Sequence, residues 1–144
     1  MPSATVSAVT DDSAPRVRRE PLPDDAVLVV RGDILDPDLL TLDARRFARR
    51  FPGWGRTGVS GYYARGEDEV TALCQTRLVN FATVVVFTWP DLERHGIDVV
   101  ATFRTPHVTL AAADSQTLVP ALIGCPHQER PNPYHGNNQT EEVR

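Results

Sequence analysis

The residues best suited to chemistry are a few arginines, tyrosines and acids between positions 31 and 69. Arg31 follows the apolar stretch Ala26–Val30, which favours a strand, so its long cation lies where a strand meets a cleft or solvent. A planar guanidinium can hold a phosphate or a carboxylate through two parallel hydrogen bonds. Arg31 is therefore a candidate anion-binding residue, with an ordinary surface arginine as the alternative.

Two adjacent tyrosines and a run of acids follow. Tyr62 and Tyr63 occupy neighbouring positions of a predicted strand, so one faces the core and the other faces outward. An outward tyrosine ring can stack on a flat ligand. Glu67, Asp68 and Glu69 could bring a carboxylate to the same cleft, or they could instead cap the following helix and complement its dipole.

Histidines and cysteines offer two further patterns. Residues 106–109 read Pro-His-Val-Thr, which looks like one half of the paired H-x-T motif of 2H phosphoesterases, but no second copy follows. Cys125, His127 and His135 could ligate a metal, yet their spacing matches no usual structural zinc pattern, and we expect no metal. The role of His107 and the role of the Cys125 group stay open.

A basic cluster lies at the end of the first predicted helix, at Arg45, Arg46, Arg49 and Arg50. Pairs spaced four residues apart form two rows that could grip phosphates. Cations in a last helical turn also complement the helix dipole. Because the formal net charge is −4, general attraction to nucleic acid or anionic lipid is not expected, and nucleic acid is an unlikely partner.

Hydrophobic patterning predicts the elements that position these residues. Thr83–Thr88 is β-branched and apolar almost throughout, as expected of a strand covered on both faces. Asp36 and Asp114 are typical helix N-caps, Glu67–Glu69 would begin another helix, and Pro90–His95 would form a short helical turn. The expected strands are Val27–Arg31, Gly58–Ala64, Thr83–Thr88, Ile97–Phe103 and His107–Ala112.

The order of these elements favours the α+β class, because it begins with strand–helix alternation and ends with a predicted hairpin. We expect a single small domain with a mixed, mostly antiparallel sheet of about five strands packed by about three to four helices. The domain would span residues 26–125, between a disordered N-terminal tail at 1–25 and a Pro-rich C-terminal tail at 126–144. No GxGxxG or P-loop motif occurs, which disfavours ordinary dinucleotide-binding and nucleotide-hydrolysing folds.

Composition favours a soluble, cytoplasmic protein. All 15 cationic side chains are arginines, so every cation is a fork-shaped donor. Two cysteines, Cys74 and Cys125, do not make a disulfide framework in a chain of this size. No apolar segment reads as a signal peptide or a transmembrane helix, so we expect no membrane partner.

Taken together, the candidate residues resemble the RES-domain toxins, small enzymes with an ADP-ribosyltransferase-like fold that destroy NAD. In that family an arginine ends an early strand. A Gly-Arg turn, a strand ending in tyrosine, an acid-initiated helix and a Val-rich strand come next. The matching positions here are Arg31, Gly55–Arg56, Tyr62 or Tyr63, Glu69–Leu73 and Val84–Phe87.

This resemblance implies a toxin-like, NAD-acting domain of the NAD glycohydrolase or ADP-ribosyltransferase type, with NAD as the candidate substrate. It also implies a protein partner, a cognate antitoxin or toxin. The alternative is a non-catalytic protein-interaction module, such as an antitoxin or immunity partner. The implied nucleotide-binding residues are Arg31, Arg56, Tyr62 and Tyr63, and the implied catalytic residues are Glu69 and Ser115.

The helix that begins near Glu67 yields a test of the predicted core. Val70, Leu73 and Cys74 recur at helical spacing, so Leu73 should pack onto the sheet. Leu73→Ala should then lower the free energy of unfolding by about 2–5 kcal/mol, because it leaves a cavity in the core. The measurement is the denaturant midpoint, and an unchanged midpoint would place this helix face in solvent.

Overall fold

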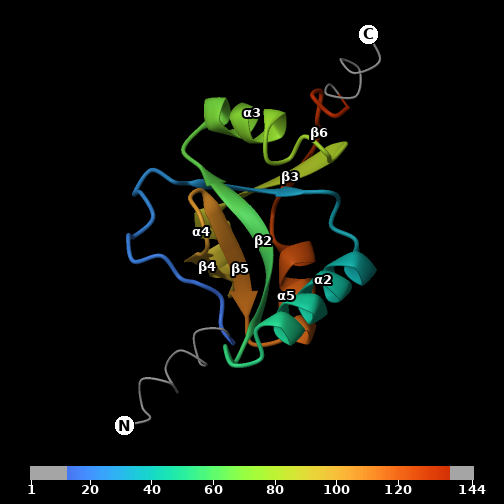
Figure 1. The fold of residues 1–144 in the computed structure, drawn as a ribbon. Coiled ribbons are helices and arrows are strands. Elements are labelled where there is room, and N and C mark those ends of the chain that lie inside the picture. Colours follow the sequence, from blue (N-terminus) through green and yellow to red (C-terminus); the bar gives the residue numbers. More distant parts are fainter. Residues whose placement is uncertain (1–12, 137–144) are drawn as a thin grey trace.

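A computed structural model describes residues 13–136, in which helices pack against a single antiparallel sheet (Figure 1). The strand order in the sheet is β4-β5-β2-β1-β3-β6. The elements in chain order are β1 (Leu28–Gly32), α2 (Pro37–Arg50), β2 (Thr57–Ala64), α3 (Glu67–Gln75), β3 (Thr83–Thr88), α4 (Trp89–Arg94), β4 (Asp98–Ala101), β5 (His107–Ala112), α5 (Ser115–Gly124) and β6 (Gln128–Pro131).

The α+β class predicted from the sequence is confirmed. The sheet has six strands and every neighbouring pair is antiparallel, whereas a mixed, mostly antiparallel sheet of about five strands was expected. The early strand–helix alternation does not produce parallel pairing, since β1 lies between β2 and β3 and runs against both.

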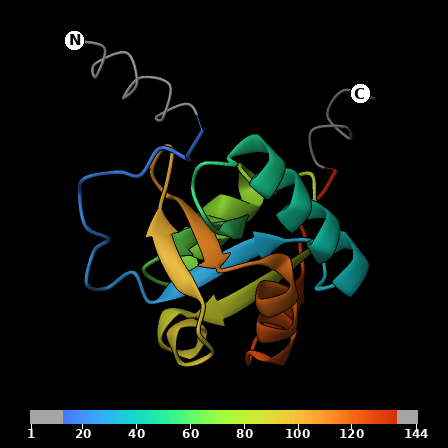
Figure 2. The same cartoon turned by 90° about the horizontal axis from the view of Figure 1, so that it is seen from below.

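Two apolar layers cover the two faces of the sheet, and Figure 2 shows helices on either side of it. Val85 and Phe87 point into the layer made with α2, α4 and α5, while Val84 and Val86 point into the layer made with α3. All four side chains are buried, which confirms that Thr83–Thr88 is covered on both faces. Leu73 is buried in the α3 layer, as its spacing predicts.

Side-chain caps fix the starts of the helices where the sequence indicates them. A carboxylate oxygen of Asp36 accepts hydrogen bonds from the backbone N–H groups of Asp38 and Leu39 at 2.8 and 3.3 Å. Asp114 accepts from the Thr117 N–H at 2.8 Å and begins α5 in the same way. These bonds satisfy N–H groups that have no partner within the helix.

Both expected tails contribute to the fold within the described residues. Residues 13–25 belong to the N-terminal tail, yet Val17 forms a β-bridge with Thr102, and the backbone N–H of Arg18 donates to Ala101. Residues 1–12 lie outside the described residues. In the C-terminal tail, β6 pairs with the edge of β3, so the expectation that the domain ends at residue 125 is wrong for this stretch.

Asn132 is the residue that ties the C-terminal segment to α3. It is buried, and its side-chain amide donates to the carbonyl groups of Cys74 and Leu78 at 3.2 and 3.0 Å. Its amide oxygen accepts from the Tyr134 N–H at 3.0 Å. Arg130 adds a two-bonded ion pair with Glu67 at the other end of α3 and lowers the pKa of that carboxyl group. Residues 130–132 therefore fasten the C-terminal segment to both ends of α3 and to the turn that follows it.

Within residues 13–136, no helix is both long enough and apolar enough to cross a membrane.

Replacement of Asn132 tests the importance of this attachment. Asn132→Ala removes both amide donors and leaves the buried carbonyl groups of Cys74 and Leu78 without that partner, so it should lower the free energy of unfolding by about 1–3 kcal/mol. The exposed Asn80 provides the matched control, and Asn80→Ala should be close to neutral. Equal denaturant midpoints for the two variants would contradict the assigned role.

Candidate functional site

The candidate site lies where β1 and β2 part from one another. The two strands are paired only where Leu28–Val30 lie opposite Tyr62–Ala64. Beyond that point β1 remains paired with β3 as far as Gly32, and β2 remains paired with β5 as far as Thr57. A pocket of about 400 Å³ opens at this fork, and we call it the fork pocket. Its walls come from both strands, from α2 and from the segment after α3.

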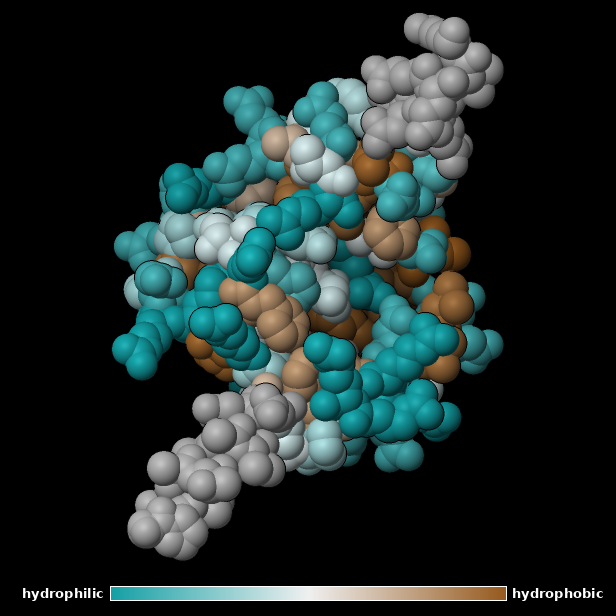
Figure 3. Space-filling model, in the orientation of Figure 1, coloured by the Kyte–Doolittle hydropathy of each residue, from teal (hydrophilic) through white to brown (hydrophobic). Residues whose placement is uncertain are grey.

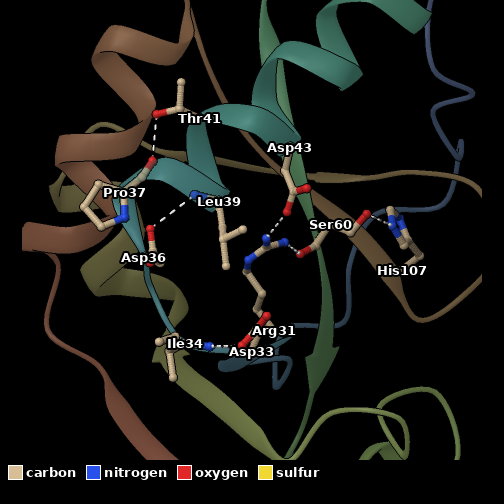
Figure 4. Close-up of polar contacts among 10 residues, drawn as sticks. All are labelled: Arg31, Asp33, Ile34, Asp36, Pro37, Leu39, Thr41, Asp43, Ser60 and His107. Atoms are coloured by element: carbon tan, nitrogen blue, oxygen red, sulfur yellow. Dashed lines mark hydrogen bonds and ion pairs between the residues drawn. The ribbon is translucent and has the colours of Figure 1, made fainter.

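Arg31 bridges the fork. One of its terminal nitrogens donates to the backbone carbonyl of Ser60 on β2 at 2.9 Å, and the other pairs with a carboxylate oxygen of Asp43 on α2 at 2.7 Å (Figure 4). The side chain is only 11% exposed, and its Nε has no hydrogen-bond partner within the described residues. Arg31 is thus a largely buried cation with an unused donor, not a strand-end surface arginine.

The lining of the fork pocket combines cations with flat rings. No ion pair involves Arg46, Arg50 or Arg77 within residues 13–136. The charged and aromatic lining residues are Arg31, Arg46, Arg50, Arg77, Asp33, Asp43, Phe47, Tyr62 and Phe81. The lining thus contains four guanidinium groups and two carboxylates. The pocket is therefore locally cationic, although the formal net charge of the whole chain is −4.

Two backbone features shape the lip of the pocket. A Cβ atom on Gly32 would lie 2.4 Å from the Phe81 ring, so only glycine lets that ring lie against β1. The next residue, Asp33, has a φ of 74°, in the left-handed region that non-glycine residues seldom adopt. Its carboxylate accepts from the Ile34 N–H at 2.9 Å, which supports this tight turn.

Ser60 lines the β2 wall of the pocket, and a histidine that is not itself among the lining residues lies beside it. The hydroxyl of Ser60 is 3.1 Å from Nε2 of His107, on the neighbouring strand β5 (Figure 4). The other ring nitrogen, Nδ1, is 2.9 Å from the hydroxyl of Thr102, which is 2.7 Å from the hydroxyl of Thr109. The edge of the His107 ring also packs against Tyr62. His107 and Thr109 of the H-x-T pattern therefore belong to one hydroxyl network, which the sequence pattern did not predict.

Burial lowers the pKa of His107 from 6.5 to about 4, and the positive charges of Arg18 and Arg77 act in the same direction. The imidazole is therefore neutral at pH 7. A neutral ring has one nitrogen free to accept a proton, so its tautomer decides what it can do next to Ser60.

The other residues implied by the family resemblance lie elsewhere. Arg56 pairs with Asp98 at 2.8 Å and stacks over Trp54, and it shares a second pocket with Ser115. Tyr63 is buried in the core. The structure thus brings Arg31 and Tyr62 together in the fork pocket and separates them from Arg56 and Ser115.

Glu69 lies in a third pocket, beside Tyr63 and Arg77. Its carboxylate accepts a hydrogen bond from the backbone N–H of Arg65 at 2.9 Å, just before α3 begins. The bond holds the chain just before the N-cap Gly66, and Glu69 also lies in the acidic first turn of α3, where a carboxylate complements the helix dipole as the alternative interpretation expects. Glu69 is not among the residues that line the fork pocket, so Arg31 and Glu69 do not meet in one pocket.

The Cys125 group contacts the chain around it. Burial raises the pKa of the Cys125 thiol to about 11, and the Asp91 charge acts in the same direction. His127 bonds through Nδ1 with the Cys125 carbonyl at 2.7 Å, and Nδ1 of His135 lies 3.3 Å from the Val79 carbonyl.

Sequence reasoning missed Asp43, Ser60 and Arg77 as parts of the site. Asp43 sits in the middle of a helix and Arg77 in the loop after another, so neither position stands out by type or spacing. The only signal for Ser60 is its place in the segment Gly58-Val-Ser-Gly61, which interrupts a strand otherwise made of β-prone residues.

Comparisons of this chain with protein-family models, with curated proteins and with solved structures found no match.

The low pKa of His107 predicts a loss of stability on mild acidification. An unfolded histidine binds a proton near pH 6.5, but the folded protein resists that proton down to about pH 4, so stability should fall through this interval as pH decreases. Because the ring is partly exposed, the loss should be about 1–2 kcal/mol. Urea unfolding at several pH values measures it.

Two variants isolate the contribution of His107. His107→Gln should remove most of this pH dependence, whereas the exposed His95→Gln should keep it. If the stability of the parent protein is constant between pH 7 and pH 5, that result would contradict the lowered pKa of His107 in the folded protein.

Proposed function

We propose that the fork pocket binds a small phosphate-bearing nucleotide, with NAD as the candidate ligand and substrate of a toxin-like domain. The observation that carries this proposal is the set of cations at the pocket, of which Arg46, Arg50 and Arg77 take part in no ion pair within the described residues. Guanidinium groups bind phosphate through paired hydrogen bonds, which gives both affinity and orientation.

Aromatic side chains support a nucleotide over a simple anion. Tyr62 lines the pocket half-buried, and the guanidinium of Arg77 lies 5.7 Å from the centre of its ring. Phe47 and Phe81 supply further flat apolar surface. A pocket of about 400 Å³ lies within the size range of small-molecule sites, and its cations and rings match the two halves of a nucleotide.

Cleavage of NAD is the more demanding part of this proposal. Breaking the nicotinamide bond builds positive charge on the ribose, which a nearby carboxylate would stabilise. Glu69, the residue implied by the family resemblance, would have to act from a neighbouring pocket. Loss of NAD in the presence of the parent protein and of Glu69→Gln therefore tests catalysis separately from binding.

A second candidate function has its own supporting observation. Apolar side chains around the fork pocket are exposed, namely those of Ile34, Leu39 and Phe81, with Leu42 one helical turn from Leu39. Figure 3 shows mostly hydrophilic surface over α2 with apolar patches nearby. Such a rim suits an acidic, amphipathic protein segment, which would make the chain an antitoxin-like or immunity-like interaction module.

Titration calorimetry with NAD and with ADP tests the binding proposal. Arg46→Ala removes an exposed lining cation and should weaken binding about ten-fold or more, because hydrogen bonds to charged groups contribute about 1.5–3 kcal/mol. Arg49→Ala, on the same helix but outside the fork pocket, should bind like the parent. Added salt should weaken binding in the parent more than in Arg46→Ala.

Two results would overturn this proposal. If the parent binds neither NAD nor ADP, nucleotide binding fails and the interaction module takes its place. If Arg46→Ala and Arg49→Ala weaken binding equally, the ligand sits outside the fork pocket. Expression of the chain alone separates the two functions, since a toxin should arrest growth and an antitoxin should not.

A further inference from the structure

The contact between Ser60 and His107 goes beyond what nucleotide binding requires. Ser60 is an exposed residue of a central strand, and it lines the fork pocket. The two residues lie on one face of the sheet, since Tyr62 pairs with His107 and Ser60 with Thr109 across β2 and β5. Sheet geometry therefore holds the hydroxyl oxygen 3.1 Å from Nε2.

The hydroxyl network allows the tautomer that nucleophilic chemistry needs. When the hydroxyl of Thr102 donates to Thr109, its oxygen can accept a hydrogen bond from the Nδ1–H group of His107 at 2.9 Å. Nε2 then carries a lone pair directed at Ser60. Burial keeps this ring neutral at pH 7, so the lone pair is available rather than protonated.

We propose that Ser60 and His107 are a nucleophile and general base at the wall of the fork pocket, which act on a carboxylic ester whose anionic group the pocket arginines hold. Ser60 lines the same pocket as Arg46, Arg50 and Arg77. A substrate anchored there through an anionic group has its remaining atoms within reach of the wall that carries the hydroxyl.

The proposed step is an acyl transfer. The oxygen of Ser60 forms a bond to the ester carbonyl carbon while its proton moves to Nε2 of His107. The bond from that carbon to the alcohol oxygen then breaks, and His107 returns the proton to the departing alcohol. Water then bonds to the carbonyl carbon of the acyl-serine while one of its protons moves to the same nitrogen. The bond from that carbon to the Ser60 oxygen breaks, His107 returns the proton to this oxygen, and the carboxylic acid leaves.

In a serine hydrolase triad a carboxylate contacts Nδ1 of the histidine, whereas here the hydroxyl of Thr102 occupies that position. A hydroxyl can orient the ring, but it stabilises a positive imidazolium less than a carboxylate does. Arg18 and Arg77 further disfavour that charge. Turnover should therefore be slow, and covalent capture of Ser60 is a better measurement than steady-state hydrolysis.

Sulfonyl fluorides provide that measurement. The serine oxygen bonds to sulfur, the sulfur–fluorine bond breaks, fluoride leaves, and the proton passes through His107 to solvent. The full chain is treated with neutral phenylmethylsulfonyl fluoride or with the anionic 4-(fluorosulfonyl)benzoate, and the labelled peptide is identified by mass spectrometry. We expect the label on Ser60, with the anionic reagent reacting faster because of the pocket arginines.

Variants separate a nucleophile–base pair from a structural hydroxyl network. Ser60→Ala should lose the label, His107→Gln should slow labelling by about 100-fold or more, and Thr41→Ala, which alters a hydroxyl on α2 bonded to the Pro37 carbonyl, should label like the parent. Labelling that persists in Ser60→Ala, or an unchanged rate in His107→Gln, would overturn the proposal. Because no nucleotide is present, failure here is distinct from failure of NAD binding.

Discussion

The bridge made by Arg31 is the interaction on which the site depends. Where β1 and β2 part, the carbonyl of Ser60 points toward a strand that no longer runs in register with it. The Arg31 guanidinium donates to that carbonyl and at the same time holds Asp43, so one side chain joins β1, β2 and α2. A largely buried cation is stable only when it is paired, and Arg31 finds both of its partners at the fork.

The open fork also explains why different chemical groups gather in one place. An antiparallel sheet normally separates the side chains of its two faces. At the fork this separation ends, so Arg31 from the α2 side and Tyr62 from the α3 side line the same pocket. Cations, rings and the hydroxyl of Ser60 thereby become accessible to a single ligand, which is the physical basis of both proposals.

Local sequence signals predicted much of the fold and little of the site. The helix caps at Asp36 and Asp114 and the strand Thr83–Thr88 depend on residues that are close in the sequence. Each of them has the structure that the local sequence predicts. Neither β6 nor Asn132 could be predicted, because a polar strand is defined by the edge it joins and not by its own pattern. The site depends on contacts such as that of Ser60 with His107, 47 positions apart, which periodicity does not encode.

Asn132 has a consequence for the order in which the chain can fold during synthesis. The carbonyl groups of Cys74 in α3 and of Leu78 in the turn after it obtain the Asn132 amide only after more than fifty further residues have been added. Strand β6, which pairs with the outer edge of β3, is also synthesised late. A nascent chain that ends before residue 128 therefore exposes an unpaired, Val-rich strand edge, and such edges recruit other chains. Translation pauses in the last segment would thus favour aggregation over completion of the domain.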